Sequence, residues 1–209
     1  MTKKIKKLKD NESTTDGLGI IIFIKNPVLG RAKTRLAKSV GDEEALRIYK
    51  LLLAHTRNIC EQVPAKRFLY YADEIWEDEW SKKLFFKYVQ NGKDLGDRMS
   101  SAFANALSDQ NKALIVGSDC SQLQSEHIKN ASKKLDEYDI VIGPTFDGGY
   151  YLIGMKKHHE HLFKKMEWSV ASVYTETISR IEEAGLTYYA LPKLSDIDTI
   201  EDWENYGLE

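Results

Sequence analysis

Four cationic side chains fall within eleven residues of an early loop, directly after an apolar run. The run Ile20–Ile24 is rich in β-branched residues, which predicts a buried strand. The chain then breaks at Asn26-Pro27 and at Gly30. Because ligands of α/β proteins sit beyond the carboxyl ends of strands, and clustered cations otherwise repel, the loop predicts a phosphate site. A solvated turn is the alternative. The cations are Lys25, Arg31, Lys33 and Arg35.

A second polar cluster follows an expected strand at residues 85–89. Gly92 and Gly96 allow a close approach of backbone to a ligand, and Arg98 opens a helix from which it can reach the same pocket. Asp94 has two interpretations. It lies beside the ligand, or its carboxylate caps the helix by accepting from free N–H groups.

Asp119 lies just beyond the apolar run 113–116, in the sequence Gly117-Ser118-Asp119-Cys120. A carboxylate there suits Mg²⁺ or Mn²⁺ bridging a diphosphate, because these hard cations take carboxylate and phosphate oxygens. The alternative is a cap for the helix expected from Ser125. Cys120 has no evident activating base nearby, which favours a packed thiol over a nucleophile.

Asp147 precedes two adjacent glycines, Gly148 and Gly149, which predicts a tight exposed turn. Tyr150 and Tyr151 follow and add a stacking surface. Asp147 is a candidate general base toward an acceptor hydroxyl, or it only shapes the turn.

Two further aspartates lie near the end of the chain. Asp196 and Asp198 share one side if their segment is extended, and so could complete a metal site. Alternatively, Asp198 or Thr199 caps the helix that follows, whose first turn is acidic. The histidines within residues 158–161 favour a solvated helix start over a metal site.

The elements that must position these residues follow from apolar spacing. A mostly parallel, three-layer α/β/α sheet of the Rossmann-like kind is predicted, because strands alternate with helices over short connections. The strand at 150–155 follows its predecessor too closely for a helical crossover and is expected to be antiparallel. Expected helices span residues 43–60, 95–107, 125–135, 170–184 and 200–206, with a short helical stripe at 75–84. The other expected strands span residues 67–71, 85–89, 113–116, 139–142 and 187–191.

Length and composition limit the class of protein. At 209 residues the chain suits one domain, expected at residues 17–209, after a Lys-rich tail at residues 1–16 that is expected to be disordered. The net charge of −2 argues against a general nucleic-acid binder. No apolar run approaches the roughly 20 residues of a membrane span. Two cysteines without a CxxC pair fit a reducing cytoplasm.

Three common enzyme signatures are missing from the sequence. There is no G-x-S-x-G and no dinucleotide fingerprint, and the stretch from Gly30 to Thr34 lacks the earlier glycine of a Walker A loop. A serine hydrolase, a P-loop ATPase and a Rossmann dehydrogenase are therefore disfavoured.

The motifs, taken in order, resemble a known family. They are Phe23-x-Lys25-x-Pro27-x-x-Gly30-x-x-Lys33-Thr34-Arg35-Leu36, Gly92-x-Asp94-Leu95-Gly96-x-Arg98-Met99, Gly117-Ser118-Asp119-Cys120, Gly143-Pro144-x-x-Asp147-Gly148-Gly149-Tyr150-Tyr151-Leu152-Ile153-Gly154 and Asp196-Ile197-Asp198-Thr199. Over about residues 18–206 the chain resembles the bacterial glycosyltransferase-like family often described as radical-SAM/selenodomain-associated transferases. That family belongs with the GT-A nucleotide-diphospho-sugar transferases, relatives of the molybdenum-cofactor and phospholactate nucleotidyltransferases.

The resemblance implies a GT-A fold and a role for each matching residue. Asp119 would be the metal aspartate, and Asp147 and Asp198 would lie near the reacting centre. Ser121 is a departure, because the family commonly has proline there, and it is expected to loosen the loop that holds Asp119. The expected nucleotide-binding residues are Lys25, Gly30, Lys33, Arg35, Gly92, Asp94 and Arg98, and the expected metal ligands are Asp119 and Asp198.

Three functions are open at this point. The first is a divalent-metal-dependent, glycosyltransferase-like enzyme with Mg²⁺ or Mn²⁺, a nucleotide-diphospho-sugar donor and an acceptor that the sequence does not identify. Its metal and basic loop would stabilise the departing diphosphate, with Asp147 as base. The second is a nucleotidyltransferase, in which a substrate phosphate attacks an NTP and pyrophosphate leaves. The third is a nucleotide-sensing protein without turnover.

Overall fold

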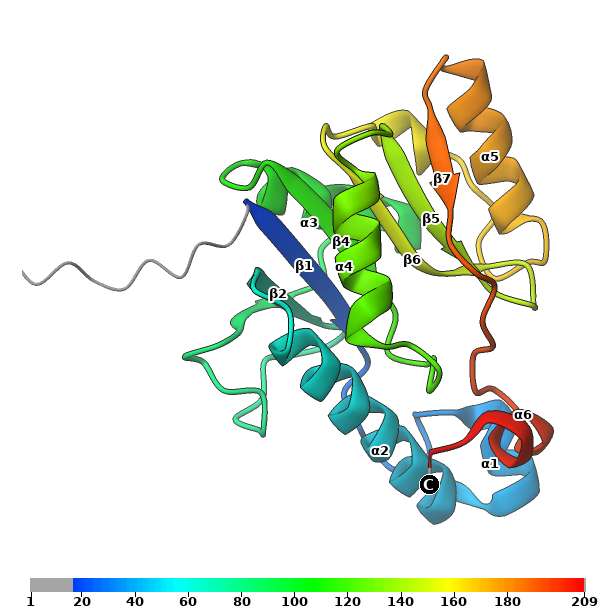
Figure 1. Cartoon of the computed structure of the whole chain (residues 1–209). Helices are drawn as coiled ribbons and strands as arrows, with labels where there is room; N and C mark the ends of the chain where they lie inside the picture. Colours follow the sequence, from blue (N-terminus) through cyan, green and yellow to red (C-terminus); the bar gives the residue numbers. More distant parts are fainter. Residues whose placement is uncertain (1–16, 209) are drawn as a thin grey trace, which may run out of the picture.

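The computed structural model describes residues 17–208, whose strands form one seven-stranded sheet in the order β3-β2-β1-β4-β6-β5-β7 (Figure 1). The tail expected at residues 1–16 lies outside the described residues. The strands are β1 (Leu18–Ile24), β2 (Lys66–Tyr71), β3 (Phe86–Val89), β4 (Lys112–Val116), β5 (Ile140–Pro144), β6 (Tyr150–Met155) and β7 (Tyr188–Ala190). The helices are α1 (Thr34–Val40), α2 (Asp42–Glu61), α3 (Leu95–Leu107), α4 (Ser125–Lys134), α5 (Val173–Glu183) and α6 (Ile200–Tyr206), with a 3₁₀ turn η1 (Glu160–Leu162).

One strand runs against its neighbours. β6 is antiparallel to both β4 and β5, whereas the other paired strands of the described sheet are parallel. The turn from β5 to β6 is too short for a crossover, and it closes with a hydrogen bond of 3.0 Å from the Thr145 amide to the Gly149 carbonyl. The predicted mostly parallel sheet with an antiparallel strand at 150–155 is confirmed.

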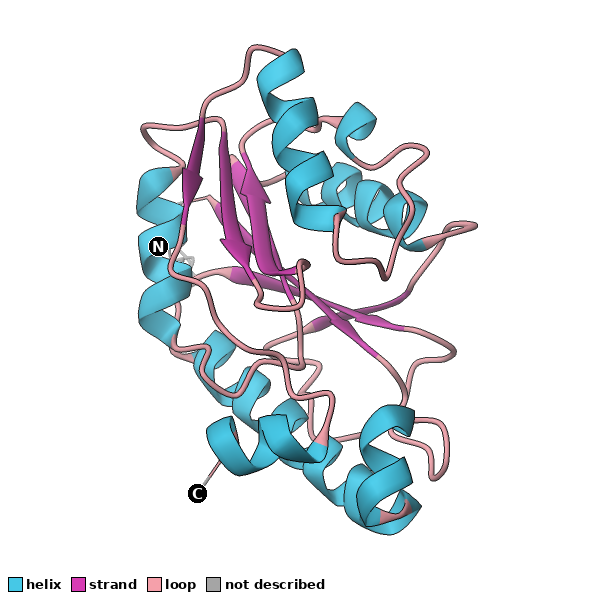
Figure 2. Ribbon diagram, turned by 90° about the vertical axis from the view of Figure 1, so that its right-hand side faces the viewer, coloured by secondary structure: helices cyan, strands magenta, loops and turns pink. Residues whose placement is uncertain are grey.

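Helices cover both faces of the sheet, which forms the middle of three layers (Figure 2). Ile20 and Ile22 of β1 pack in the core with α2 and α4, and Ile21 packs in the core with α3 and α5. Neighbouring residues of a strand point to opposite faces, so an uninterrupted apolar run can supply two cores at once.

The short helices α1 and α6 pack beside α2, away from the sheet (Figure 1). Leu36 of α1, Ile48 of α2 and Ile197 just before α6 belong to one small buried cluster. This packing brings the C-terminal segment beside the loop after β1, where the cations lie.

The direction of winding reverses at β1. From β1 the chain continues to β2 and β3 on one side, and it then crosses to β4 on the other side. The carboxyl ends of β1 and β4 therefore flank a crevice, which is where ligands bind in open α/β sheets.

The helical stripe predicted at residues 75–84 is wrong, because this segment consists of bends and a turn. Asp78 is held by two residues of the sheet: Tyr71 Oη donates to its Oδ2 at 2.7 Å, and Lys87 Nζ lies 2.6 Å from its Oδ1. Trp80 packs edge-to-face on Phe85, with ring centroids 4.9 Å apart. These contacts outweigh the local helical spacing.

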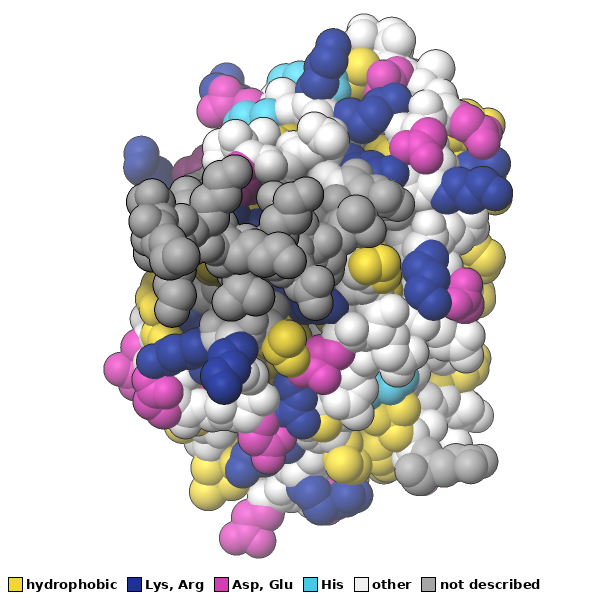
Figure 3. Space-filling model, turned by 60° about the vertical axis from the view of Figure 1, so that its left-hand side comes forward, with side chains coloured by type: hydrophobic (Ala, Val, Ile, Leu, Met, Phe, Trp, Pro, Cys, Tyr) yellow, Lys and Arg dark blue, Asp and Glu magenta, His cyan; other side chains and the backbone are white. Residues whose placement is uncertain are grey.

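The surface carries both signs of charge. On the face drawn in Figure 3, Lys and Arg side chains are interspersed with Asp and Glu side chains, outside the area that grey atoms cover. None of the helices within residues 17–208 is long and apolar enough to cross a membrane.

Candidate functional site

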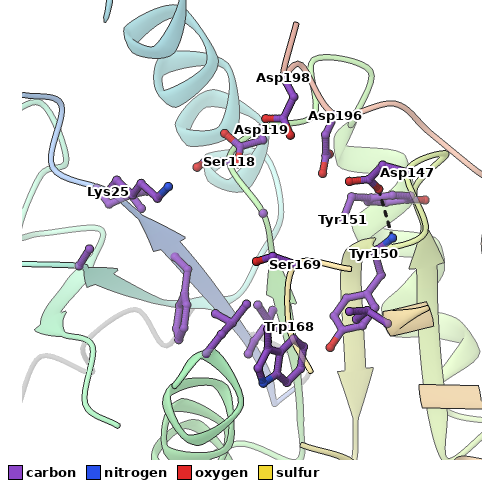
Figure 4. Close-up of a pocket in the computed structure, with 18 of the residues that line it drawn as sticks. Lys25, Ser118, Asp119, Asp147, Tyr150, Tyr151, Trp168, Ser169, Asp196 and Asp198 are labelled. Atoms are coloured by element: carbon purple, nitrogen blue, oxygen red, sulfur yellow. Dashed lines mark hydrogen bonds between the residues drawn. The ribbon is translucent and has the colours of Figure 1, made fainter. Parts of the chain in front are cut away.

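A cleft of about 740 Å³ opens at the carboxyl ends of β1 and β4 (Figure 4). The loops after these strands, the first turn of α3, the turn between β5 and β6, and two segments near residues 168–173 and 196–198 line it. The predicted site residues that line the cleft are Lys25, Lys33, Arg35, Arg98, Asp119, Asp147 and Asp198.

One end of the cleft, here called the charged end, contains Lys33, Arg35, Asp119, Asp196 and Asp198, and Lys33 lies between two of these carboxylates. Its Nζ is 2.6 Å from Oδ1 of Asp119 and 3.3 Å from Oδ1 of Asp198, and only 5% of its side chain is exposed. Its backbone is left-handed, with φ 50°. Burial alone would lower the pKa of Lys33, but the charges of Asp119, Asp198 and Asp196 and the hydrogen bond to Asp119 together outweigh burial and raise the pKa. Lys33 is therefore a buried ammonium held between two carboxylates.

Of the two residues considered as caps of α6, Thr199 takes this position. Its hydroxyl accepts from the Asp202 amide at 3.2 Å, while the Asp202 carboxylate accepts from the Thr199 amide at 2.8 Å. The Asp198 side chain faces the cationic loop instead, with its Oδ2 3.3 Å from Nη1 of Arg35. The geometry therefore places Asp198 in the cleft rather than at the cap.

Asp196 also lines the cleft, close to Asp119 and Asp147 (Figure 4). Burial raises the pKa of Asp196 to about 7, and the charge of Asp119 adds to the rise while Lys33 opposes it. In the sequence, Asp196 was a candidate because it shares one side of an extended segment with Asp198. The charged end thus contains more carboxylates than buried cations.

Two contacts to the C-terminal segment anchor the loop that carries Asp119. The carbonyl oxygen of Asp119 accepts from the Ile197 amide at 2.9 Å. Ser121, at the position where proline is common in the family, is buried, and its hydroxyl donates to the carbonyl of Tyr206. Ser121 therefore ties the loop to α6, in place of the loosening that its departure from proline suggested.

Asp147 sits in the exposed turn between β5 and β6. Its Oδ1 accepts from Thr145 Oγ1 at 2.5 Å and from the Gly149 amide at 3.1 Å. Thr145 is 1% exposed, so one of the two donors is buried in the fold. Among the described residues no hydrogen bond is made to Oδ2 of Asp147. One carboxylate oxygen of Asp147 is thus held by two donors, and the other has no hydrogen-bond partner among the described residues.

The Lys25 side chain is exposed and reaches the cleft from the end of β1 (Figure 4). Tyr49 of α2 fixes its backbone, because the Tyr49 hydroxyl accepts from the Lys25 amide at 2.9 Å and donates to the Lys25 carbonyl at 3.1 Å. Burial raises the pKa of Tyr49, and the charge of Asp119 adds to the rise, so this hydroxyl stays protonated.

Three expected nucleotide-binding residues, Gly30, Gly92 and Asp94, lie outside the described lining of the cleft. Asp94 caps α3, since its Oδ1 accepts from the Asp97 amide at 2.8 Å, as the alternative interpretation predicted. At Gly92, φ is 151° and a Cβ would lie 2.6 Å from the Arg98 amide nitrogen. These residues shape the loops that present Arg98 and the cations.

One wall of the cleft was not predicted from the sequence. It is formed by the segment Trp168–Ala171, part of which falls in the helix predicted at 170–184, whereas α5 begins at Val173. Ser169 has a left-handed backbone with φ 63°. A tryptophan and a serine in an irregular segment produce no periodic signal, so only the tertiary structure reveals this wall.

The charged end has the donor chemistry of a divalent-cation site. Asp119 and Asp198 offer hard oxygen ligands of the kind that Mg²⁺ and Mn²⁺ prefer. Within residues 17–208, no group of three or more His, Cys, Asp or Glu side chains is already arranged to hold a metal ion. The residues fit such an ion chemically, provided that Lys33 moves from between the two carboxylates.

Neither cysteine belongs to a reactive site. Cys60 and Cys120 are free and buried, and burial raises the pKa of both thiols to about 12. The histidine cluster lies at η1, where Nε2 of His158 is 2.8 Å from Oγ of Ser100.

Comparison with known proteins identifies relatives of this chain. Residues 56–170, over half of the chain, match the model of a family described as "Uncharacterized protein conserved in bacteria (DUF2064)". A crystal structure from Desulfovibrio desulfuricans G20, provisionally assigned as a nucleotide-diphospho-sugar transferase, is 31% identical with a TM-score of 0.83. That match covers 88% of this chain and 83% of the other. No curated protein matches the chain.

Other solved structures share the fold at much lower identity. The inositol-1-phosphate CTP transferase from T. maritima is 11% identical with a TM-score of 0.58, over 88% of this chain and 90% of that one. The 4-diphosphocytidyl-2C-methyl-D-erythritol synthase from Anaerococcus prevotii DSM 20548 is 12% identical with a TM-score of 0.59, over 95% and 98%. These likenesses show the fold alone. The nucleotide-sugar transferase fold predicted from the motifs is confirmed.

Proposed function

The chain belongs to the DUF2064 family of bacterial proteins, and we propose that it is a divalent-metal-dependent, glycosyltransferase-like enzyme. The donor is a nucleotide-diphospho-sugar, and the acceptor carries a hydroxyl group. One observation carries the proposal: cations of the loop after β1 and three aspartates, Asp119, Asp147 and Asp198, line one cleft at the switch point of the sheet. The provisional assignment of the 31% identical relative supports this substrate class.

The cationic loop is suited to hold the diphosphate of the donor. Lys25, Arg31 and Arg35 line the cleft with exposed side chains. Arg31 is ion-paired with Asp73 and Arg35 with Asp198. Arg98 adds a cation from α3. Negative charge grows on the nucleoside diphosphate as it leaves, and cations placed beside it stabilise that charge.

Asp147 is suited to take the proton of the acceptor. The acceptor oxygen attacks the anomeric carbon, the bond from that carbon to the diphosphate oxygen breaks, and the hydroxyl proton passes to Oδ2 of Asp147. The support of Oδ1 by Thr145 and Gly149 fixes the direction of Oδ2. Asp147→Asn should lower kcat by about 10²-fold and leave donor affinity nearly unchanged.

Asp119 and Asp198 are the residues that would hold Mg²⁺ or Mn²⁺. When bound, such an ion neutralises charge on the diphosphate oxygens. Lys33 would then be free to contact the diphosphate, because its two carboxylate partners would be shared with the ion.

A nucleotidyltransferase is the second candidate, and the four loop cations favour it. A substrate phosphate oxygen attacks the α-phosphorus of an NTP, the bond from that phosphorus to the bridging oxygen breaks, and pyrophosphate leaves. A triphosphate carries more negative charge than a diphosphate and so suits Lys25, Arg31, Lys33 and Arg35 well. The CTP transferase from T. maritima has a similar fold.

Thermal shift with NTPs, NDPs and NDP-sugars, each with and without Mn²⁺, tests these functions. The largest rise in melting temperature with an NDP-sugar supports the first candidate, and the largest rise with an NTP supports the second. No rise with any nucleotide would refute both, and binding without turnover on any acceptor would leave a sensing protein.

Two aspartate variants complete this test. Asp119→Asn should abolish the Mn²⁺-dependent part of the shift. Asp109→Asn is the matched control, because Asp109 is ion-paired with Lys66 and lies outside the described lining of the cleft.

A further inference from the structure

The segment Trp168–Ala171 spans the cleft between two glycines that permit close contact. At Gly96, in the first turn of α3, a Cβ would lie 2.9 Å from Nε1 of Trp168. At Gly148, directly after Asp147, a Cβ would lie 2.0 Å from the carbonyl oxygen of Ala171. The segment therefore packs against α3 at one end and against the turn of the candidate base at the other.

Hydrogen bonds are also made by residues on either side of this segment. Before it, Nη1 of Arg180 donates to the carbonyls of Leu162 at 3.3 Å and Lys164 at 2.6 Å. After it, the Tyr174 amide donates to the Gly148 carbonyl at 2.8 Å. Hydrogen bonds on both sides thus tie this part of the chain to α5 and to the turn between β5 and β6.

Ser169 occupies a strained position in the middle of the wall. Its φ of 63° lies in the left-handed region, which non-glycine residues rarely adopt. The side chain is exposed to the cleft, and Figure 4 shows Ser169 between Trp168 and the aspartates of the charged end. The described residues make no hydrogen bond with its hydroxyl. Strain of this kind clusters at ligand-binding positions.

The chemistry of the wall differs from that of the rest of the cleft. Trp168 is partly buried, with its Nε1 edge against Gly96, so other parts of the indole are available to the cleft. Val170 and Ala171 add apolar surface, and Ser169 adds one hydroxyl. None of these four residues carries charge. A wall of this composition suits an uncharged ring that has an apolar face and hydroxyl groups at its edge.

We infer that the Trp168–Ala171 segment is the subsite for the sugar of the donor, with the indole of Trp168 under the ring and Ser169 Oγ bonded to a sugar hydroxyl. This inference rests on the proposed glycosyl transfer. The position supports it, because the contact of Ala171 with Gly148 places the wall beside Asp147, where the transferred group must lie. A charged phosphate of an acceptor would find no counter-ion on this segment.

Paired affinities test the subsite. Calorimetry in Mn²⁺ compares UDP with UDP-glucose, GDP with GDP-mannose, and dTDP with dTDP-glucose. For at least one pair, the wild type should bind the sugar nucleotide about tenfold more tightly than the diphosphate. Trp168→Ala should remove this preference, and Trp168→Phe should keep most of it, while the affinity for the diphosphate alone stays unchanged.

Ser169→Gly separates the hydroxyl from the fold. Glycine tolerates a φ of 63°, so the melting temperature should not fall, yet the sugar preference should drop about threefold. A wild type that binds each diphosphate as tightly as its sugar nucleotide would overturn the subsite. Variants that weaken both ligands equally would also overturn it. Failure of all these ligands to bind would instead refute the proposed function.

Discussion

The ammonium of Lys33 lies 2.6 Å from a carboxylate oxygen of Asp119 and 3.3 Å from one of Asp198, two groups that would also be the ligands of a divalent ion. One buried cation thus occupies the space between the carboxylates that a second cation needs. Because two cations cannot share that space without strong repulsion, metal binding and the position of Lys33 are coupled.

Lys33→Met should therefore bind Mn²⁺ more tightly than the wild type in the absence of nucleotide, by about tenfold, because the competing ammonium is gone. Electron paramagnetic resonance of free Mn²⁺ during a titration measures this directly. Affinity for pyrophosphate should fall in the same variant, since a cation that contacts the diphosphate is lost.

Lys38→Met is the matched control for that experiment, because Lys38 is exposed in the last turn of α1. It should leave Mn²⁺ binding unchanged. If Lys33→Met fails to fold, Lys33→Gln provides the same loss of charge. Weaker or equal Mn²⁺ binding in a folded Lys33 variant would show that the ammonium does not compete with the metal.

Ser121→Ala should lower the free energy of unfolding by about 1 kcal/mol, because the carbonyl of Tyr206 loses its donor. Chemical denaturation with urea measures the loss. The Mn²⁺-dependent thermal shift should weaken as well, since this bond anchors the loop of Asp119 to α6. An unchanged midpoint would mean that the loop is held by other contacts alone.

Two glycine substitutions separate crowding from backbone strain. Gly148→Ala should destabilise the protein by about 3 kcal/mol, because φ is 92° and the new Cβ would meet the Ala171 carbonyl at 2.0 Å. Gly185→Ala is the control, with φ 66° and nothing within 4 Å of the new Cβ, and should cost only about 1 kcal/mol. Equal unfolding midpoints in urea would contradict the close contact at Gly148.

Neither thiol of the native protein should react with a disulfide reagent at pH 8. Burial raises the pKa of Cys60 and Cys120 from the ordinary value of 9.0 to about 12, so both stay protonated. Both should react once the chain is unfolded in guanidinium. Rapid labelling of Cys120 in the native state at pH 8 would contradict its burial.

The same shift predicts how stability depends on pH. The raised thiol pKa values favour the folded state fully below pH 9, and this contribution is lost as the pH rises toward about 12.

The fold was predictable because its signals are local. A β-branched run such as Ile20–Ile24 has no good alternative to a strand buried on both faces, and the short link before Tyr150 excludes a parallel crossover. The segment 75–84 was not predictable, because Asp78 is held by Tyr71 and Lys87 from the sheet. Such contacts leave no trace in local spacing.

The candidate site was predictable in its parts, because cations and carboxylates follow the strands β1 and β4 directly in the sequence. Which cation lies beside which carboxylate was not predictable from the sequence. Lys33 and Asp198 are 165 residues apart and meet only because α1 and α6 pack together beside α2. The wall at Trp168 likewise depends on two distant glycines, Gly96 and Gly148. Side-chain periodicity is a property of neighbouring residues, whereas a binding cleft requires the winding of the sheet and the packing of its helices, which act over the whole chain.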